Sequence, residues 1–129
     1  MNFELDAPYL EIQRQARDFA KTIEPVAVEA DEMSEIHPLV LDALRASGLS
    51  DLMVPAEYGG RTERLDPLAI CIVREALMAV SAHADSMFAL QGIGSYAITV
   101  AGTTEQREHW LPKVATAEAL PAPRFDPSR

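Results

Sequence analysis

Residues 102–118 read GTTEQREHWLPKVATAE, and this stretch connects two expected helices. Gly102 follows an apolar run that ends at Ala101, so it is placed to end a helix in the left-handed conformation that glycine adopts easily. Thr103 has the side chain of an N-cap residue, and Gln106, three residues later, completes a capping box. The stretch therefore predicts a corner between two consecutive helices.

The second helix of this corner contains a proline. Trp110, Leu111 and Val114 supply its apolar face. Pro112 has no N–H group, so a helix that contains it loses a hydrogen bond. We therefore expect the helix to end near Leu111 and Pro112 to begin another short turn. Taken alone, these residues describe a helix–turn–helix corner and no particular function.

The amino-acid sequences of two blocks resemble those of a known protein family. Residues 102–118 follow the pattern Gly-Thr-x-Glu-Gln-x-x-x-Trp-Leu-Pro-Lys-x-Ala-x-x-Glu. This pattern resembles the end of the N-terminal helical domain of acyl-CoA dehydrogenases. Residues 54–60, VPAEYGG, are similar to the Pro-x-x-Tyr-Gly-Gly loop of the same family. The resemblance implies the fold of that N-terminal domain.

Two further blocks agree with the resemblance, and one stretch departs from it. Residues 74–77, REAL, resemble the family's helix with an acidic pair before leucine, and residues 27–31 resemble the end of its first helix. The blocks occur in family order and cover about residues 8–119. Many members carry another glycine shortly after the glycine pair, whereas residues 61–64 of this chain read RTER.

The spacing of apolar residues predicts an all-α fold. Gaps of three and four residues mark helix faces along most of the chain. The expected helices span residues 8–30, kinked or ended early by Pro25, residues 38–47, stopped by Gly48, a segment opened by Asp66 and Pro67, residues 85–101, and the block after Thr103. The resemblance implies an orthogonal or up-down bundle of about five to six helices over residues 1–118, followed by a proline-rich irregular tail over residues 119–129.

Three local features complete the expected fold. Residues 49–65 form a loop in which residues 52–54 pack as a short extended piece. Gly59 and Gly60 allow a sharp reversal that side chains would block. Residues 68–73 are apolar on every side, which predicts a central helix with Cys71 as a buried small hydrophobic residue.

Composition limits the classes of partner. The 129 residues form one domain with a core, and 48% apolar with only 6% aromatic residues favours helices packed through aliphatic side chains. The net charge of −9 argues against nucleic acid or an anionic membrane as partner. No apolar run approaches the ~20 residues of a membrane span, and no secretory signal is recognisable. A single cysteine excludes an internal disulfide, so a soluble cytoplasmic protein is expected.

The resemblance also implies a substrate-contacting helix. In the family, the acyl chain lies between helices of the N-terminal domain and the later domains. The matching helix here is residues 85–101, and Ala89, Gly92, Ile93 and Tyr96 would face the acyl tail. The alternative is that these four residues are ordinary core and helix-contact positions.

The three histidines are not assigned a catalytic or metal-binding role. His83 is expected as a turn or capping residue at the preceding helix junction. His37 and His109 are expected at the surface, because no cluster of Cys, Asp or Glu gives them metal-site spacing.

No catalytic, cofactor-binding or metal-binding residue is assigned to this chain. The family's flavin, FAD, lies largely against a β-domain that follows the block at residues 102–118, and the glutamate that removes the substrate α-proton belongs to the C-terminal part. Residues 119–129 contain three prolines instead of the expected strand. We therefore expect the N-terminal portion of an enzyme of fatty acid metabolism that dehydrogenates acyl-CoA thioesters at the α,β-position, truncated and inactive alone, with FAD not held by this chain by itself.

The sequence leaves more than one interpretation open. The first is this enzyme portion, with a flavin domain or related subunits as partner, and the second is a small helical protein-interaction module derived from the same domain. A self-contained enzyme is a third and weaker hypothesis. In the first case the face that meets the other domains is apolar, which predicts self-association of the isolated chain.

Overall fold

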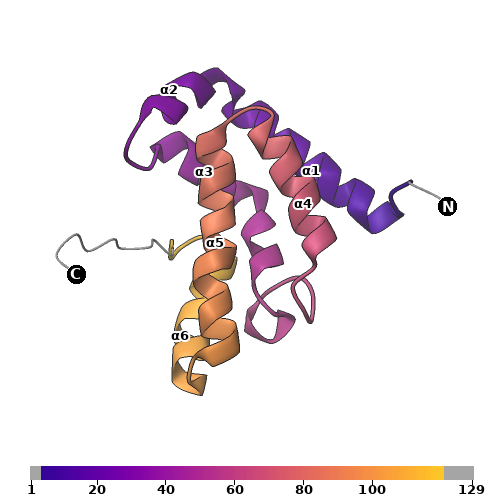
Figure 1. Ribbon diagram of the computed structural model, residues 1–129, viewed down its shortest axis with the longest axis vertical. Coiled ribbons are helices and arrows are strands. Elements are labelled where there is room, and N and C mark those ends of the chain that lie inside the picture. The colour runs from indigo at the N-terminus through magenta and orange to yellow at the C-terminus, as the bar shows by residue number, and fades with distance from the viewer. Residues whose placement is uncertain (1–3, 121–129) are drawn as a thin grey trace.

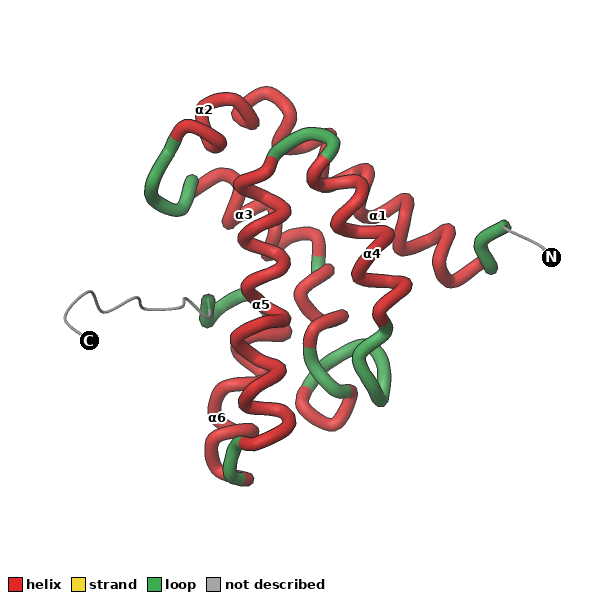
Figure 2. Tube along the Cα trace, in the orientation of Figure 1, coloured by secondary structure: helices red, strands yellow, loops and turns green. Residues whose placement is uncertain are grey.

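The computed structural model describes residues 4–120, and these form a bundle of six α-helices (Figure 1). The helices are α1 (Ala7–Ile23), α2 (Ala27–Glu32), α3 (Pro38–Ser47), α4 (Pro67–Met78), α5 (Ala82–Ala101) and α6 (Thr104–Ala115). Three 3-10 helices connect them: η1 (Glu24–Val26), η2 (Leu49–Met53) and η3 (Ala56–Tyr58). Over residues 4–120 the chain has no strand, only an isolated bridge between Pro55 and Thr62 (Figure 2). The all-α prediction is confirmed.

The helices enclose one main core and a smaller one. α1 packs along α4, while α5 contacts α4, α6, η2, α2 and α3. Figure 1 shows α5 as the long helix near the middle, with α6 beside its C-terminal half. Phe88 of α5 is fully buried in the main core together with Ile23 of α1 and Leu44 of α3. The smaller core gathers Leu111 and Val114 of α6 with other residues around η3.

Prolines and capping residues set most helix boundaries as predicted. The helix expected over residues 8–30 is interrupted at Pro25, where η1 separates α1 from α2. Gly48 ends α3 with a φ of 70°. The Asp66 carboxylate accepts the N–H groups of Leu68 and Ala69 at the start of α4. α5 begins three residues earlier than expected, at Ala82, because the preceding serine, Ser81, serves as its N-cap.

Residues 102–118 form the predicted corner between two helices but differ from the prediction in two details. The capping box is confirmed: Thr103 Oγ1 accepts from Gln106 N at 3.2 Å, and Thr103 N donates to Gln106 Oε1 at 2.9 Å. The prediction of a left-handed conformation at Gly102 is wrong, since the φ angle of this residue is −71°. Glycine is needed for space instead, because a Cβ at Gly102 would lie 2.4 Å from the carbonyl oxygen of Ile98.

The predicted break before Pro112 is also wrong. α6 continues through Pro112 to Ala115. Pro112 lies on the exposed side of the helix near its C-terminal end, as does Glu108 four residues earlier. The carbonyl that loses its intrahelical partner is therefore reachable by water, which reduces the cost of the proline. Trp110 is not part of the apolar core face: it is 45% exposed, and the Lys113 ammonium lies 5.6 Å from its ring centroid.

Three further expectations need correction. Residues 52 and 53 belong to the 3-10 helix η2, and only Val54 is extended, although all three are buried. α4 is amphipathic rather than buried on every side, because one side faces α1 while Cys71 is exposed. His37 is buried at 5% exposure instead of lying at the surface, and its backbone N–H donates to His83 Nε2 of α5, whereas His109 is exposed as predicted.

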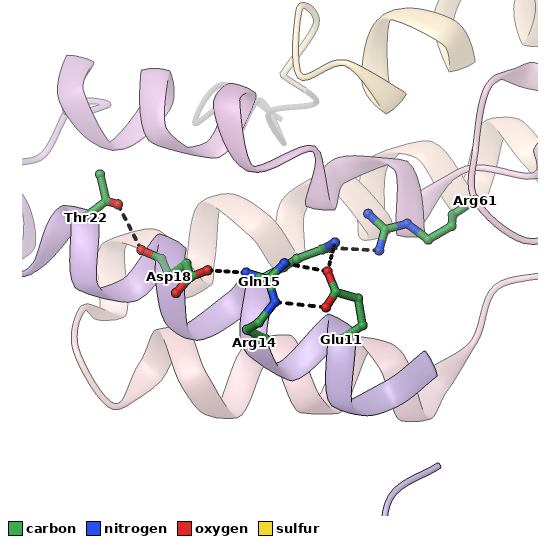
Figure 3. Close-up of polar contacts among 6 residues, drawn as sticks. All are labelled: Glu11, Arg14, Gln15, Asp18, Thr22 and Arg61. Atoms are coloured by element: carbon green, nitrogen blue, oxygen red, sulfur yellow. Dashed lines mark hydrogen bonds and ion pairs between the residues drawn. The ribbon is translucent and has the colours of Figure 1, made fainter. Parts of the chain in front are cut away.

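Arg61, in the stretch that departs from the family pattern, fastens the loop between η3 and α4. Its Nη1 donates to Gln15 Oε1 of α1 at 3.0 Å, and its Nε donates to Asp51 Oδ2 at 3.2 Å. Figure 3 shows Arg61 meeting a row of polar side chains along α1. In this row Arg14 and Gln15 hydrogen-bond the Glu11 carboxylate and lower its pKa to about 2. Because these side chains are solvent-exposed, the row contributes little to stability.

The boundary between domain and tail is not tested by the fold. Residues 121–129, which hold most of the predicted irregular tail, lie outside the described residues. Ala119 follows α6, and its N–H donates to the carbonyl of Lys113 in the last turn of that helix at 3.0 Å. Leu120 packs against the main core.

Candidate functional site

An apolar groove lies between α4 and α5. Its volume is about 420 Å³, and η2 and the loop before α4 complete its walls. All four residues predicted to face an acyl tail line this one groove. The lining residues are Met53, Leu65, Pro67, Ile70, Arg74, Ala89, Gly92, Ile93 and Tyr96.

The α5 side of the groove follows helical spacing. Residues 92 and 93 lie three and four positions after residue 89, and residue 96 lies four and three positions after them, which places all four on one face of α5. Ile93 is 69% exposed and Tyr96 is 54% exposed, so no element within residues 4–120 covers these two side chains. The exposure of Ile93 and Tyr96 differs from that of core positions, whereas the alternative of helix-contact positions stays open.

Gly92 sets the depth of the groove. A Cβ at this position would lie 2.7 Å from Met53 Sδ, so glycine lets the Met53 side chain lie directly against α5. Ser95 Oγ donates to the carbonyl oxygen of Met53 at 3.2 Å and holds η2 in place. Another element therefore approaches α5 closely at Gly92, and this element is η2.

The groove continues along α5 beyond Tyr96. A second hollow of about 390 Å³ shares Met53, Leu65 and Tyr96 with the first. Thr99 and Val100 extend it along the helix, and Glu63 and Arg64 border it with charged side chains. Together the two hollows form a continuous path over the α5 face.

An ion pair that sequence reasoning missed stands at the other end of the groove. Arg74 Nε donates to Asp85 Oδ1 at 2.8 Å and Arg74 Nη2 donates to Asp85 Oδ2 at 2.7 Å. Asp85 is 2% exposed, whereas the Arg74 side chain is 48% exposed. The paired carboxylate raises the pKa of Arg74 further. The signal was present in the groove-facing spacing of Pro67, Ile70 and Arg74, but the partner lies eleven residues away on another helix.

Removing Arg74 and removing Asp85 are expected to reduce the unfolding free energy by different amounts. Arg74→Ala leaves the buried Asp85 carboxylate unpaired, which we expect to cost about 2–3 kcal/mol, less than for a fully buried pair because water reaches the arginine side. Asp85→Ala leaves a half-exposed arginine that water can solvate, so about 1 kcal/mol is expected. Urea denaturation followed by circular dichroism measures both. Equal losses, or a larger loss for Asp85→Ala, would contradict this asymmetry.

His83 joins the loop before α3 to the start of α5. Its Nε2 accepts the backbone N–H of His37 at 3.1 Å, so the ring is neutral in this arrangement. Asp31 accepts from Ser81 Oγ at 2.5 Å and from the N–H groups of Ala82 and His83, which satisfies the first turn of α5. His83 thus lies at the helix junction as predicted, while Ser81 and Asp31 perform the capping. No reacting geometry surrounds it.

This junction predicts a pH dependence of stability. Burial lowers the pKa of His83 below its ordinary 6.5, so the unfolded chain binds this proton more readily than the folded chain. Stability is therefore complete above pH 6.5 and falls as the pH drops through that value, by at most about 1.4 kcal/mol per pH unit for one proton. Urea midpoints at neutral and mildly acidic pH measure the slope. His83→Gln should reduce it, whereas the exposed control His109→Gln should not, and an unchanged slope in His83→Gln would contradict the assignment.

Two other kinds of site receive no support. Within residues 4–120 no group of three or more His, Cys, Asp or Glu side chains is arranged to hold a metal ion. Among the helices in the same range, none combines the length and apolar character needed to cross a membrane.

The comparisons with known proteins agree with the fold. Residues 8–118 match the family model described as the acyl-CoA dehydrogenase N-terminal domain. The protein named "Probable acyl-CoA dehydrogenase fadE25" from Mycobacterium leprae is 33% identical over 119 residues, which are 92% of this chain and 30% of that protein. The chain thus spans about a third or less of the curated relatives it matches.

Two solved structures share the fold. Butyryl-CoA dehydrogenase from Megasphaera elsdenii superposes with a TM-score of 0.74 at 20% identity, covering 93% of this chain and 32% of that one. The flavoprotein nitroalkane oxidase superposes with a TM-score of 0.72 at 22% identity, covering 93% of this chain and 29% of that one. With the match over residues 8–118, these findings establish that the chain belongs to the acyl-CoA dehydrogenase family and has the fold of its N-terminal domain.

Proposed function

We propose that this chain supplies one wall of the acyl pocket of a flavin-dependent acyl-CoA dehydrogenase. The observation that carries the proposal is the convergence of Ala89, Gly92, Ile93 and Tyr96 on one apolar groove. The family resemblance predicts that these residues face an acyl tail, and an apolar groove suits the methylene groups of an acyl chain. In this role the groove binds and orients the chain of the thioester.

The exposed apolar face of α5 is an argument that a partner domain packs against it. Ile93, Tyr96 and Val100 are more than half exposed and lie three, four and seven residues apart along one helix face. Solvent exposure of such a row is unfavourable, and a flavin domain packed against it would bury the row and close the groove. In the isolated chain the same row favours self-association, which sedimentation at increasing concentration measures.

The groove itself does not fit a flavin's pyrophosphate. The N-terminus of α4 borders the groove at Pro67, and helix N-termini are common phosphate sites. Here the Asp66 carboxylate already accepts the N–H groups of Leu68 and Ala69, and its negative charge repels a phosphate. We therefore assign FAD binding and the α-proton base to other parts of the enzyme, and we propose that this chain has no dehydrogenase activity alone.

A titration of the isotope-labelled chain with octanoyl-CoA tests the binding role. Backbone amide signals of Gly92, Ile93 and Tyr96 are expected to shift. Ile93→Asp should weaken binding strongly, because it places a charge on the apolar wall. Val28→Asp, at an equally exposed apolar position on α2, is the matched control and should leave binding unchanged. Shifts confined to other surfaces, or no shifts, would overturn the proposal.

The absence of independent activity has its own test. The chain is mixed with FAD and octanoyl-CoA, desalted, and assayed for a retained flavin spectrum and for reduction of an electron-accepting dye. No retained flavin and no dye reduction are expected. Turnover by the chain alone would show that it holds a complete active site and would refute this part of the proposal.

A helical interaction module is the second candidate. The observation that favours it is Trp110, which is 45% exposed on α6 and borders a hollow shared with Ala97 and Gly102. Exposed aromatic residues are frequent anchors of protein interfaces. The octanoyl-CoA titration separates the two candidates, because a module without an acyl-binding role leaves the α5 signals unmoved.

A further inference from the structure

The groove between α4 and α5 ends at the Arg74–Asp85 pair. The two helices form an antiparallel hairpin joined by residues 79–81. Positions 74 and 89 therefore lie at the joined end of the groove, while positions 67 and 96 lie at the end that continues into the second hollow. A chain that enters past Tyr96 and follows the groove thus meets Arg74 with its far end.

Arg74 presents unused hydrogen-bond donors at this end. A guanidinium carries five N–H groups, and Asp85 accepts from Nε and from Nη2. Neither Nη1 nor the second N–H of Nη2 has a partner among the described residues. Apart from the Tyr96 hydroxyl, the other lining side chains of this hollow are apolar. An alkyl terminus placed against the guanidinium displaces water from these donors and leaves them unsatisfied, which is unfavourable.

The charge of the pair narrows the kind of acceptor. The Asp85 carboxylate is buried and held in a two-point contact with the guanidinium, so the pair is close to electrically neutral. A ligand carboxylate beside Arg74 gains little from a charge that Asp85 already balances, and it is repelled by Asp85 itself. A neutral oxygen accepts the same hydrogen bond without bringing a second negative charge into the site.

We propose that Arg74 is a specificity-determining residue that selects acyl groups with a neutral oxygen, a hydroxyl or a carbonyl, at their distal end. This inference rests on the proposed acyl-pocket function and adds its substrate class. Asp85 is the positioning residue, because its two-point contact fixes the guanidinium with the free donors available to the groove.

The experiment measures dissociation constants of the full chain for matched thioesters of N-acetylcysteamine. Each ω-hydroxyacyl thioester of a short length series is compared with the alkyl thioester in which a methyl replaces the hydroxyl. At the best length the hydroxyl compound is expected to bind about tenfold more tightly, the size of one well-formed hydrogen bond. The side-chain Nε–H signal of Arg74 should shift only with the hydroxyl compound. A ligand with a terminal carboxylate is expected to bind more weakly than the hydroxyl compound.

Variants separate recognition from stability. The double variant Arg74→Met with Asp85→Leu replaces the pair by apolar side chains and leaves no unpaired buried charge. It should bind the hydroxyl and alkyl compounds with equal affinity, while circular dichroism confirms that it folds. Arg17→Met, at an exposed arginine of α1 outside the groove, is the control and should keep the preference.

Each other outcome has a definite meaning. Equal affinity for the hydroxyl and alkyl compounds, tighter binding of the carboxylate, or a preference that survives in the double variant would overturn the inference and leave the acyl-pocket function standing. Binding of neither compound would remove the acyl-pocket function, and this inference would fail with it.

Discussion

Gly60→Ala is expected to prevent stable folding of the domain. A Cβ at this position would lie 1.5 Å from the carbonyl oxygen of Val54 and 2.9 Å from the carbonyl carbon of Pro55. Both are backbone atoms, so no side-chain rotation relieves the clash. The segment is also fixed by a hydrogen bond from Gly60 N to Pro55 O at 3.1 Å. We expect a loss of more than about 4 kcal/mol, a large part of the stability of a domain this size.

Gly48→Ala is the matched control for this prediction. Gly48 has a φ of 70°, but nothing lies within 4 Å of an added Cβ. Its substitution therefore costs only the left-handed backbone strain, about 1–2 kcal/mol. Urea denaturation measured by circular dichroism compares the two variants. If Gly60→Ala unfolded at the same urea concentration as Gly48→Ala, the loop would have to be able to open around residue 60, and the tight reversal described above would be wrong.

Phe88→Ala is expected to cost about 3–5 kcal/mol of unfolding free energy. Phe88 has no exposed surface and lies in the main core, where neighbours from several helices surround it. Truncation loses the transfer free energy of the ring and leaves a cavity that rigid helices fill only partly. A denaturant midpoint shift with little change in slope is the expected observation.

The companion variants locate the origin of this effect. Phe88→Leu keeps most of the buried volume and should cost only about 1–1.5 kcal/mol. Ile93→Ala, on the exposed side of the same helix, should change stability by less than about 0.5 kcal/mol. Similar losses for Phe88→Ala and Phe88→Leu would contradict this explanation, because they would mean that the shape of the ring matters and its volume does not.

Local chemistry made most of the helix boundaries predictable. Pro25, Gly48 and Asp66 act on the residues beside them, so their effect is contained in a few positions of sequence. The capping box at Thr103 is of the same kind. The errors at Gly102 and Pro112 arose where local rules allow two outcomes. At Gly102 the contact with Ile98 decided, and at Pro112 the solvent-exposed side of α6 made a proline within the helix tolerable.

The burial of side chains was less predictable. Cys71 and Trp110 are apolar in character and were expected inside, yet both are exposed, while the polar His37 is buried. Apolar character states that burial is favourable but not which neighbour provides it. α1 covers one face of α4, and Cys71 lies outside that contact. His37 lies next to α5, where its backbone N–H donates to His83 Nε2.

For the groove, local patterns and the family resemblance were enough to predict helix α5 and its face of Ala89, Gly92, Ile93 and Tyr96. That Met53 lies against this face and that Arg74 pairs with Asp85 at the end of the groove became visible in the packed helices. The two kinds of feature differ in the range of the interactions behind them. Capping, helix spacing and glycine conformation depend on residues within about one turn. An ion pair across a helical hairpin and a thioether packed on a glycine depend on how separate elements come together, which local patterns do not encode.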